Sequence, residues 1–169
     1  MRLESFELDN KRDILVYLPR SYATSDRSYP VLYMQDGQNL FDQETSFAGE
    51  WQVDEAMERL AEDEALEAIV VGIPNAGESR LAEYSPFADR RFGGGKADAY
   101  LRFVLGTVKP LVDRKFRTQR ERESTGIAGS SMGGLLALYA FFEYGESFGR
   151  VGAVSPKEKT IVPPACKFA

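Results

Sequence analysis

The chain has 169 residues, of which 43% are apolar and 28% charged, and its formal net charge is −5. It is long enough for one well-buried core and too short for two ordinary domains. The acidity and the lack of a dense lysine–arginine cluster exclude a typical nucleic-acid-binding surface. No apolar run could span a bilayer, and the charged start does not resemble a signal peptide, so we expect a cytoplasmic protein that binds neither nucleic acid nor membranes.

The first expected elements are β-strands. Residues 3–8 and 14–19 are separated by a polar segment, which suggests an antiparallel pair. Residues 31–34 form a short apolar run that ends in an Asp-Gly pair, as expected of a buried strand entering a loop. Apolar residues then recur at helical spacing over residues 53–60, which predicts a surface helix packed on one face.

Residues 68–74 predict a second buried strand, because they are apolar on both faces and a proline ends them. The Gly- and Ser-rich segment that follows has no periodicity and predicts a long loop. A helix is expected from residue 98 onward. Pro110 lies within it, four residues after Gly106, so we expect a bend in this helix and not a break.

Residues 125–130 and 150–155 complete the expected strands, and a helix that follows Ser131 separates them. Strands alternating with helices of this length predict an α/β fold with a mostly parallel sheet covered on both faces. We expect one domain over residues 1–156. Residues 157–169 show no clear period and are expected to form an irregular tail.

The segment "TGIAGSSMGG" carries Ser131 at the centre of a Gly-x-Ser-x-Gly pattern. An apolar strand precedes this serine and an apolar-faced helix follows it, which is the setting of the nucleophile elbow of α/β-hydrolases. Small residues flank the serine there because the backbone is strained and closely packed. The alternative is a turn that only requires small residues or that binds a phosphate at the helix N-terminus.

An oxyanion hole needs two backbone N–H groups aimed at the developing negative charge. In this fold the residue after the nucleophile, Met132, supplies one, and the loop after the third strand supplies the other. In that loop Gly37 permits close backbone approach, which makes Gln38 the predicted second donor and Asn39 its alternative. The competing interpretation is that the loop is a simple turn.

Five sequence blocks, in this order, resemble the putative-esterase family of α/β-hydrolases: "VLYMQDGQNLFD", "WQVDEAMERL", "VVGIPNAGESRLAEYSPF", "GGGKADAYLRFVLGTVKPLVDRKFRT" and "TGIAGSSMGGLLALYAFFEYGESFGRVGAVSP". That family includes esterase D and enterochelin-esterase-like proteins. The resemblance implies a three-layer α/β-hydrolase fold with a sheet of about six strands. It also implies hydrolysis of small-molecule carboxylic esters by a Ser-His-Asp triad without a cofactor. Ser131 carries over as the nucleophile, with Gln38 and Met132 as oxyanion donors.

Three aromatic residues match positions close to the family's substrate cleft. They are Phe41, Trp51 and Tyr84. Each of them also suits a role as a core or loop-anchoring side chain, so both interpretations stay open.

The chain departs from the family in its acid–base residues. It contains no histidine, and Gln35 and Ser124 stand where family members often carry one. The family continues through two further strands whose loops bring the acidic and histidine members of the triad. We therefore expect a C-terminally truncated hydrolase in which no residue inherits the role of general base.

Several residues could replace the missing histidine. A lysine with a lowered pKa could do so, at position 157 or 159, and so could a carboxylate acting through water, Asp36 or Asp89. Solvated or turn-forming roles compete with each of these four side chains. The single cysteine, Cys166, can form neither an internal disulfide nor a cysteine–histidine zinc site, so we expect it to be inert and no metal to be bound.

The sequence as a whole predicts an esterase for small or activated esters, since a serine with an oxyanion hole but no base retains roughly 10³ to 10⁴ of acceleration over water. Two alternatives remain: a non-catalytic hydrolase-like protein that binds a ligand or partner, and a truncated gene product. Without the two further strands, the strand at 150–155 would be an open sheet edge. We expect a homo-oligomer formed through this edge or through the tail.

Overall fold

The computed structural model describes residues 1–47, 49–90 and 93–156. Its central sheet has five strands. Across the sheet these are, in order, β3 (Leu15–Tyr17), β5 (Ile69–Ile73), β4 (Val31–Gln35), β8 (Thr125–Ser130) and β9 (Arg150–Val154). β3 runs antiparallel to β5, and all the other neighbouring strands are parallel. The mostly parallel sheet expected from the sequence is therefore confirmed.

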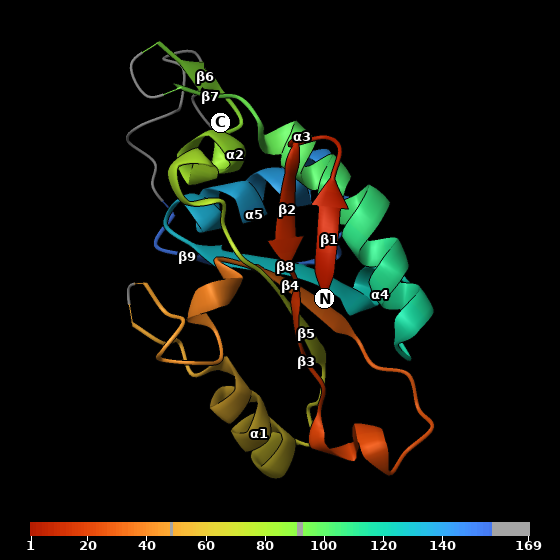
Figure 1. Cartoon of the computed structure of the whole chain (residues 1–169). Coiled ribbons are helices and arrows are strands. Elements are labelled where there is room, and N and C mark those ends of the chain that lie inside the picture. Colours follow the sequence, from red (N-terminus) through yellow and green to blue (C-terminus); the bar gives the residue numbers. More distant parts are fainter. Residues whose placement is uncertain (48, 91–92, 157–169) are drawn as a thin grey trace.

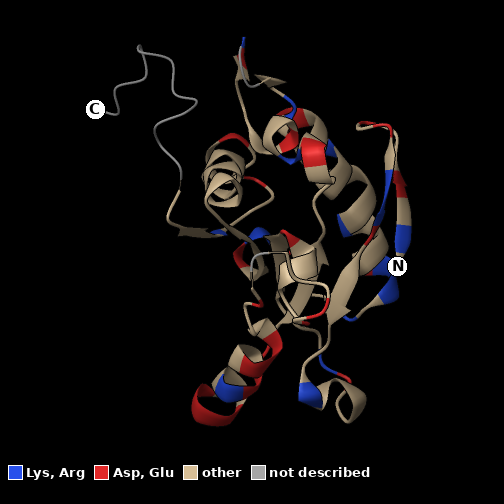
Figure 2. Ribbon diagram, turned by 60° about the vertical axis from the view of Figure 1, so that its left-hand side comes forward, with Lys and Arg blue, Asp and Glu red and all other residues tan. Residues whose placement is uncertain are grey.

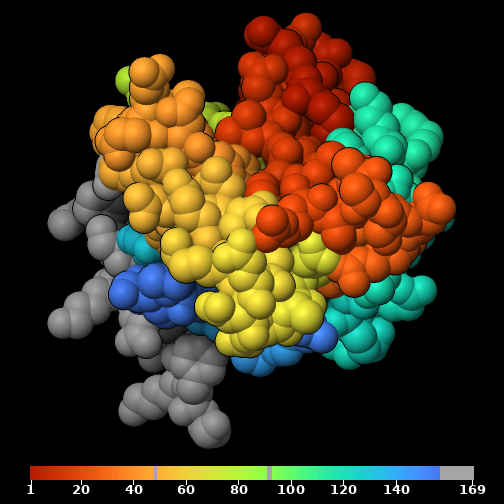
Figure 3. All heavy atoms as spheres, turned by 90° about the horizontal axis from the view of Figure 1, so that it is seen from below, coloured from red at the N-terminus to blue at the C-terminus, as the bar shows by residue number. Residues whose placement is uncertain are grey.

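Helices cover both faces of this sheet (Figure 1). α1 (Val53–Glu64) lies on one face, and Figure 3 shows that α1 and the segment before it, in orange to yellow, cover that side of the molecule. The other face carries α3 (Ala97–Phe103), α4 (Lys109–Lys115) and α5 (Met132–Glu143). α2 (Arg80–Tyr84) packs against α3 and α5. The arrangement is the three-layer α/β architecture that the resemblance implies.

Alternation along β4 divides the core between the two helical layers. Tyr33 belongs to the larger apolar cluster, which includes Phe103 of α3 and Leu136 of α5. Its neighbour Met34 points to the opposite face and packs with Met57 of α1. The outward side of α1 is rich in acidic residues (Figure 2), so α1 is the one-sided surface helix that its spacing predicts.

The N-terminal strands pair differently from the sequence-based expectation. β1 (Arg2–Ser5) pairs with β2 (Asn10–Asp13) in a hairpin of its own, and β3 joins the central sheet beside β5. The predicted pairing of residues 3–8 with 14–19 is therefore wrong. The polar segment between them forms a strand because its Arg12 finds a buried partner on α2, a contact that local polarity does not reveal. The central sheet accordingly has five strands where about six were expected.

The segment after β5 is more ordered than predicted. It contains α2 and a short antiparallel pair formed by β6 (Ala88–Asp89) and β7 (Gly93–Gly94), so the expectation of one long loop is wrong for these stretches. Farther along, a π-helical segment (Val104–Val108) joins α3 to α4. Pro110 is the second residue of α4, directly after the π-helical segment, and the helical path that begins at Ala97 runs on to Lys115. The helix therefore continues past the proline, as predicted.

Two further expectations concern the end of the chain and membranes. The predicted tail, 157–169, lies outside the described residues. β9 pairs with β8 and, within the described part of the chain, with no other strand. Across those same residues no helix is both long and apolar enough to cross a membrane.

A buried ion pair fastens the N-terminal hairpin to α2. Arg12 Nη2 lies 2.5 Å from Glu83 Oε2, and both side chains are 2% exposed. Arg12 also donates a hydrogen bond to the carbonyl of Pro74 at 3.1 Å, and its guanidinium lies 5.5 Å from the centre of the Tyr100 ring. α2 also carries Arg80, which lines a cavity together with Ser131. The buried ion pair therefore helps to fix one side of that cavity.

Replacing Glu83 by alanine should lower the free energy of unfolding by about 3–5 kcal/mol, because Arg12 would remain buried without its counter-ion. Urea-induced unfolding measures the change. Glu4→Ala is the matched control on the same hairpin: its ion pair with Lys11 is more than half exposed, so its loss should cost less than about 1 kcal/mol. Similar losses in the two variants would contradict a stabilising role for the buried pair.

Candidate active site

Ser131 lies in the sharp turn between the end of β8 and the start of α5, with φ 55° and ψ −116°. Positive φ is unfavourable for a residue with a side chain, so surrounding contacts must hold it. The Ser131 N–H donates to the carbonyl of Val154 on β9 at 2.9 Å, and the Ser131 carbonyl accepts from the N–H of Leu135 at 3.1 Å. This is the strand–turn–helix geometry of a nucleophile elbow.

Close packing explains the glycine before the turn. A methyl group on Gly129 would lie 2.5 Å from Gln35 Oε1 and 2.7 Å from the carbonyl carbon of Gly133. Real side chains do not approach backbone so closely, and the end of β4, the end of β8 and the first turn of α5 can meet here only without a side chain. The small flanking residues of the sequence motif therefore have a steric cause.

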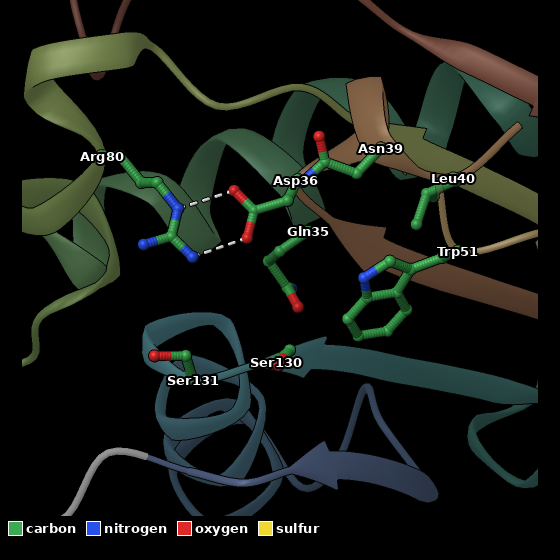
Figure 4. A pocket seen from close by; sticks show the side chains of 8 residues that line it. All are labelled: Gln35, Asp36, Asn39, Leu40, Trp51, Arg80, Ser130 and Ser131. Carbon is green, nitrogen blue, oxygen red and sulfur yellow. Dashed lines mark hydrogen bonds and ion pairs between the residues drawn. The ribbon is translucent and has the colours of Figure 1, made fainter. Parts of the chain in front are cut away.

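Ser131 opens into a cavity of about 180 Å³ (Figure 4). The lining residues are Gln35, Asp36, Asn39, Leu40, Trp51, Arg80, Ser130 and Ser131. A second cavity, of about 410 Å³, shares Arg80 and is also lined by Gln38 and Phe47. The ends of β4 and β8 thus meet the segments before α1 and at α2, and together they surround the serine.

The two predicted oxyanion donors differ from their alternative in hydrogen bonding. The N–H of Asn39 already donates to the carbonyl of Asp36 at 2.9 Å. Among the described residues, the N–H of Gln38 has no protein acceptor. Met132 is the first residue of α5, where a backbone N–H has no intrahelical acceptor. Hydrogen bonding leaves the N–H of Gln38 available, whereas Asn39 lines the Ser131 cavity and Gln38 lines the second cavity, so the choice of donor stays a prediction.

Arg80 and Asp36 form an ion pair on the side of the cavity opposite Trp51 (Figure 4). Nε and Nη2 of Arg80 donate to the two carboxylate oxygens, each at 2.7 Å, and Asn75 Nδ2 donates to Oδ1 at 2.7 Å. The hydrogen bonds to Asp36 raise the pKa of Arg80 above its ordinary value. Since N–H donors already engage both of its oxygens, Asp36 is poorly placed to take a proton from Ser131.

The three predicted aromatic residues lie in different surroundings. Trp51 lines the cavity and is 40% exposed. Tyr84 is fully buried beneath it, where its hydroxyl accepts a hydrogen bond from the N–H of Asp36 at 3.2 Å and burial raises the pKa of that hydroxyl well above its ordinary value. Phe41 packs with Leu40 and lies 6.4 Å, centre to centre, from the ring of Tyr17. Only Trp51 of the three lines the serine cavity.

Of the other candidate bases, Asp89 lies in the described part of the chain, and it does not line this cavity. Asp89 lies on β6, and Ser124 precedes β8 at the end of the strand far from Ser131. Lys157, Lys159 and Cys166 lie outside the described residues. Gln35, by contrast, lines the cavity beside Ser131. Of the two positions where family members often carry histidine, only this one is at the site.

The sequence analysis missed Arg80, Asn75 and Ser130. A usable signal was present for the first two, because they follow β5, and the carboxyl ends of neighbouring parallel strands share one edge of a sheet. Nothing local indicates that Arg80 would reach Asp36, 44 positions earlier in the chain. The sequence also predicted a loop where α2 forms, and α2 is the helix that positions Arg80.

One cluster of carboxylates among the described residues has oxygens close enough together to bind a cation. Oxygens of Glu50, Asp54 and Glu55 lie within 4.8 Å of one another. These residues stand at the start of α1, where acidic side chains are ordinarily stabilised by the helix dipole. They do not line the serine cavity, so the cluster has no evident connection with Ser131.

A strained serine between a parallel strand and a helix, on a mixed sheet covered by helices on both faces, defines a protein of the α/β-hydrolase fold. Residues 5–163 match the family described as "Putative esterase". The chain belongs to this family, and the resemblance carried by the five sequence blocks is confirmed.

Relatives of this chain include proteins named esterases. It is 33% identical to the siderophore triacetylfusarinine C esterase of Aspergillus fumigatus, over 90% of this chain and 55% of that protein. It is 32% identical to "Uncharacterized protein YbbA" of Bacillus subtilis, over 90% and 59%. The crystal structure of an IroE-like serine hydrolase from Shewanella oneidensis superimposes with a TM-score of 0.73 and 26% identity, over 90% and 48%. The chain thus spans little more than half the length of these curated relatives.

Gly129→Ala should lower the free energy of unfolding by about 1–3 kcal/mol, because the added methyl group overlaps Gln35 and the backbone of Gly133. Gly106→Ala is the matched control: the nearest atom to its added methyl group is Glu7 Oε1 at 4.0 Å. Its stability should be unchanged or higher by roughly 0.5–1 kcal/mol. Urea-induced unfolding compares the two, and a Gly129→Ala variant as stable as the wild type would contradict the close packing of the turn.

Proposed function

We propose that this chain carries the nucleophile and oxyanion hole of a carboxylic-ester hydrolase that acts on small or activated esters. The observation that carries the proposal is the strained strand–turn–helix that presents Ser131 to a cavity. The start of α5, where the N–H of Met132 has no intrahelical acceptor, supports the oxyanion hole. The relative named siderophore triacetylfusarinine C esterase supports an ester as the substrate. The proposed reaction needs neither a metal nor an organic cofactor.

In the proposed reaction, Ser131 Oγ attacks the ester carbonyl carbon, and the carbonyl oxygen becomes an oxyanion. The N–H groups of Gln38 and Met132 donate hydrogen bonds to this oxyanion, which are stronger in the transition state than in the bound ester. The C–O bond to the alcohol then breaks and leaves an acyl group on Ser131. Water attacks this acyl-enzyme, releases the acid and restores the serine.

Removal of the hydroxyl proton of Ser131 limits the rate of this reaction. The chain contains no histidine, and in this proposal water or hydroxide accepts the proton, with Lys157 and Lys159, outside the described residues, as the alternatives. Esters with stable leaving groups, such as nitrophenyl esters, need no protonation of the leaving alcohol and are the favoured substrates. The acceleration expected from the oxyanion hole and binding alone is roughly 10³ to 10⁴ over water.

The absence of histidine favours a second candidate function, in which the cavity binds a small ligand without turning it over. The same cavity, with Trp51 at one side and Arg80 at the other, would then serve as a binding site only. Ester turnover that depends on Ser131 separates the two functions. A cytoplasmic location remains a prediction from the sequence.

The Ser131→Ala variant should lose the enzymatic hydrolysis of 4-nitrophenyl acetate, falling at least 100-fold toward the buffer rate, because the nucleophile is removed. Release of 4-nitrophenolate measures the rate. Ser130→Ala is the matched control, since Ser130 lines the same cavity one residue earlier, and its activity should stay within about threefold of the wild type. Equal rates for wild type and Ser131→Ala would refute the serine mechanism and favour the binding function.

We also propose that the chain forms a homo-oligomer through the β9 edge, residues 150–155, or through the tail. In support, Val151 and Val154 on β9 are 36% and 53% exposed, and an open apolar edge strand favours pairing with another chain. Light scattering after size exclusion should give a mass of at least twice 18.9 kDa. Val154→Lys should shift this mass toward the monomer, because a charged edge opposes pairing. A monodisperse monomer at all concentrations tested would contradict the proposal.

A further inference from the structure

Gln35 is a buried polar side chain whose hydrogen-bonding capacity is unused. It stands at the carboxyl end of β4, opposite Ile73 of β5, and is 2% exposed. Neither Oε1 nor Nε2 of its amide has a hydrogen-bond partner among the described residues. Leaving such atoms unpaired costs about 1–3 kcal/mol each. A side chain that carries this cost calls for a partner that the folded chain itself does not supply.

The surroundings of Gln35 explain why no protein group pairs with its amide. Its side chain lies against Gly133 and Gly129, the small residues of the serine turn. On its open side it lines the cavity shared with Ser130 and Ser131, and Figure 4 shows the amide directed from the end of β4 toward the serine turn. The amide thus lies between the serine turn and the cavity with both of its polar atoms covered, so a substituent of a bound ester would reach them by a turn of the side chain toward the cavity.

We infer that Gln35 is a specificity-determining residue of the Ser131 site, and that the site prefers acyl groups with a hydroxyl or amide substituent close to the ester carbonyl. This inference rests on the proposed esterase function. Oε1 accepts a hydrogen bond and Nε2 donates one, so the matching substituent must both donate and accept. Hydroxyl and amide groups do both. A purely aliphatic acyl group of the same size would bury the amide without pairing it, and such mismatches are strongly disfavoured.

Arg80 and Asp36 do not compete for this role. They pair with each other through two hydrogen bonds of 2.7 Å, and Asp36 also accepts one from Asn75. The neighbouring Trp51 offers an apolar ring to the same cavity. Gln35 is thus the neutral polar group of the cavity that is buried and unpaired among the described residues.

The test compares two 4-nitrophenyl esters of almost equal shape, the 3-hydroxybutanoate and the 3-methylbutanoate, in which a methyl group replaces the hydroxyl. Each kcat/KM is divided by the rate of that ester with hydroxide, so that intrinsic reactivity cancels. The wild type should prefer the hydroxy ester by about tenfold, the value of one well-made hydrogen bond. Gln35→Met, which keeps the volume but removes both polar atoms, should abolish the preference.

Stability provides a second measurement on the same variant. Gln35→Met should unfold at the same urea concentration as the wild type or a higher one, because it removes unpaired buried polar atoms. The control for the ester comparison is Gln119→Met, which makes the same change at an exposed loop residue. This variant should retain the tenfold preference for the hydroxy ester. A Gln35→Met variant that is clearly destabilised would assign the amide a structural bond and overturn the inference.

Three kinetic outcomes would separate this inference from the proposed function. Equal losses for both esters in Gln35→Met would indicate that the amide positions Ser131, and an unchanged preference would indicate no role; both overturn the inference alone. If the wild type turns over neither ester faster than Ser131→Ala does, the esterase function fails. In that case, ligand-observed NMR compares the binding of the two free acids to the wild type and to Gln35→Met. A wild-type preference for 3-hydroxybutanoate that Gln35→Met removes supports the inference. Equal binding of the two acids by the wild type overturns it.

Discussion

The positive φ of Ser131 is the constraint on which the site depends. A residue with a side chain adopts this conformation only when neighbouring contacts outweigh its cost. Here the carbonyl of Val154 accepts the hydrogen bond of Ser131, and Gly129 lets the end of β4 approach the turn. Three parallel strands and the start of α5 are therefore needed to present one serine hydroxyl.

The same sheet edge assembles the remaining parts of the site. β4 and β5 are parallel neighbours, so the segments that follow them emerge side by side. Gly37 lies so close to β5 that a methyl group there would be 2.5 Å from the carbonyl carbon of Gly72. This contact and the Arg80–Asp36 ion pair hold the loop that carries Gln38. Two ion pairs on α2, one buried and one at the cavity, connect the N-terminal hairpin to the site.

Sequence patterns correctly predicted the strands and helices that bury apolar residues at regular spacing. β5 is apolar on both faces, and the helix after Ser131 buries its small and apolar residues, so composition and spacing reveal both. Patterns were misleading where a distant partner outweighs local polarity. β2 is polar yet forms a strand, since Arg12 pairs with Glu83, 71 positions away. α2 was predicted as part of a loop because its order depends on contacts with Asp36 and Arg12.

The sequence alone determined that the chain has an α/β-hydrolase fold and that Ser131 lies at a strand–helix turn. Both can be predicted locally, because buried strands are apolar and the turn requires small residues around the serine. It also determined that these 169 residues contain no histidine. The tertiary structure decided which neighbours share a cavity with Ser131. It brought Trp51, Arg80 and Gln35 to the site and left Phe41 and Tyr84 in the packing around it. Those positions follow from strand order and long-range pairing, which no short stretch of sequence encodes.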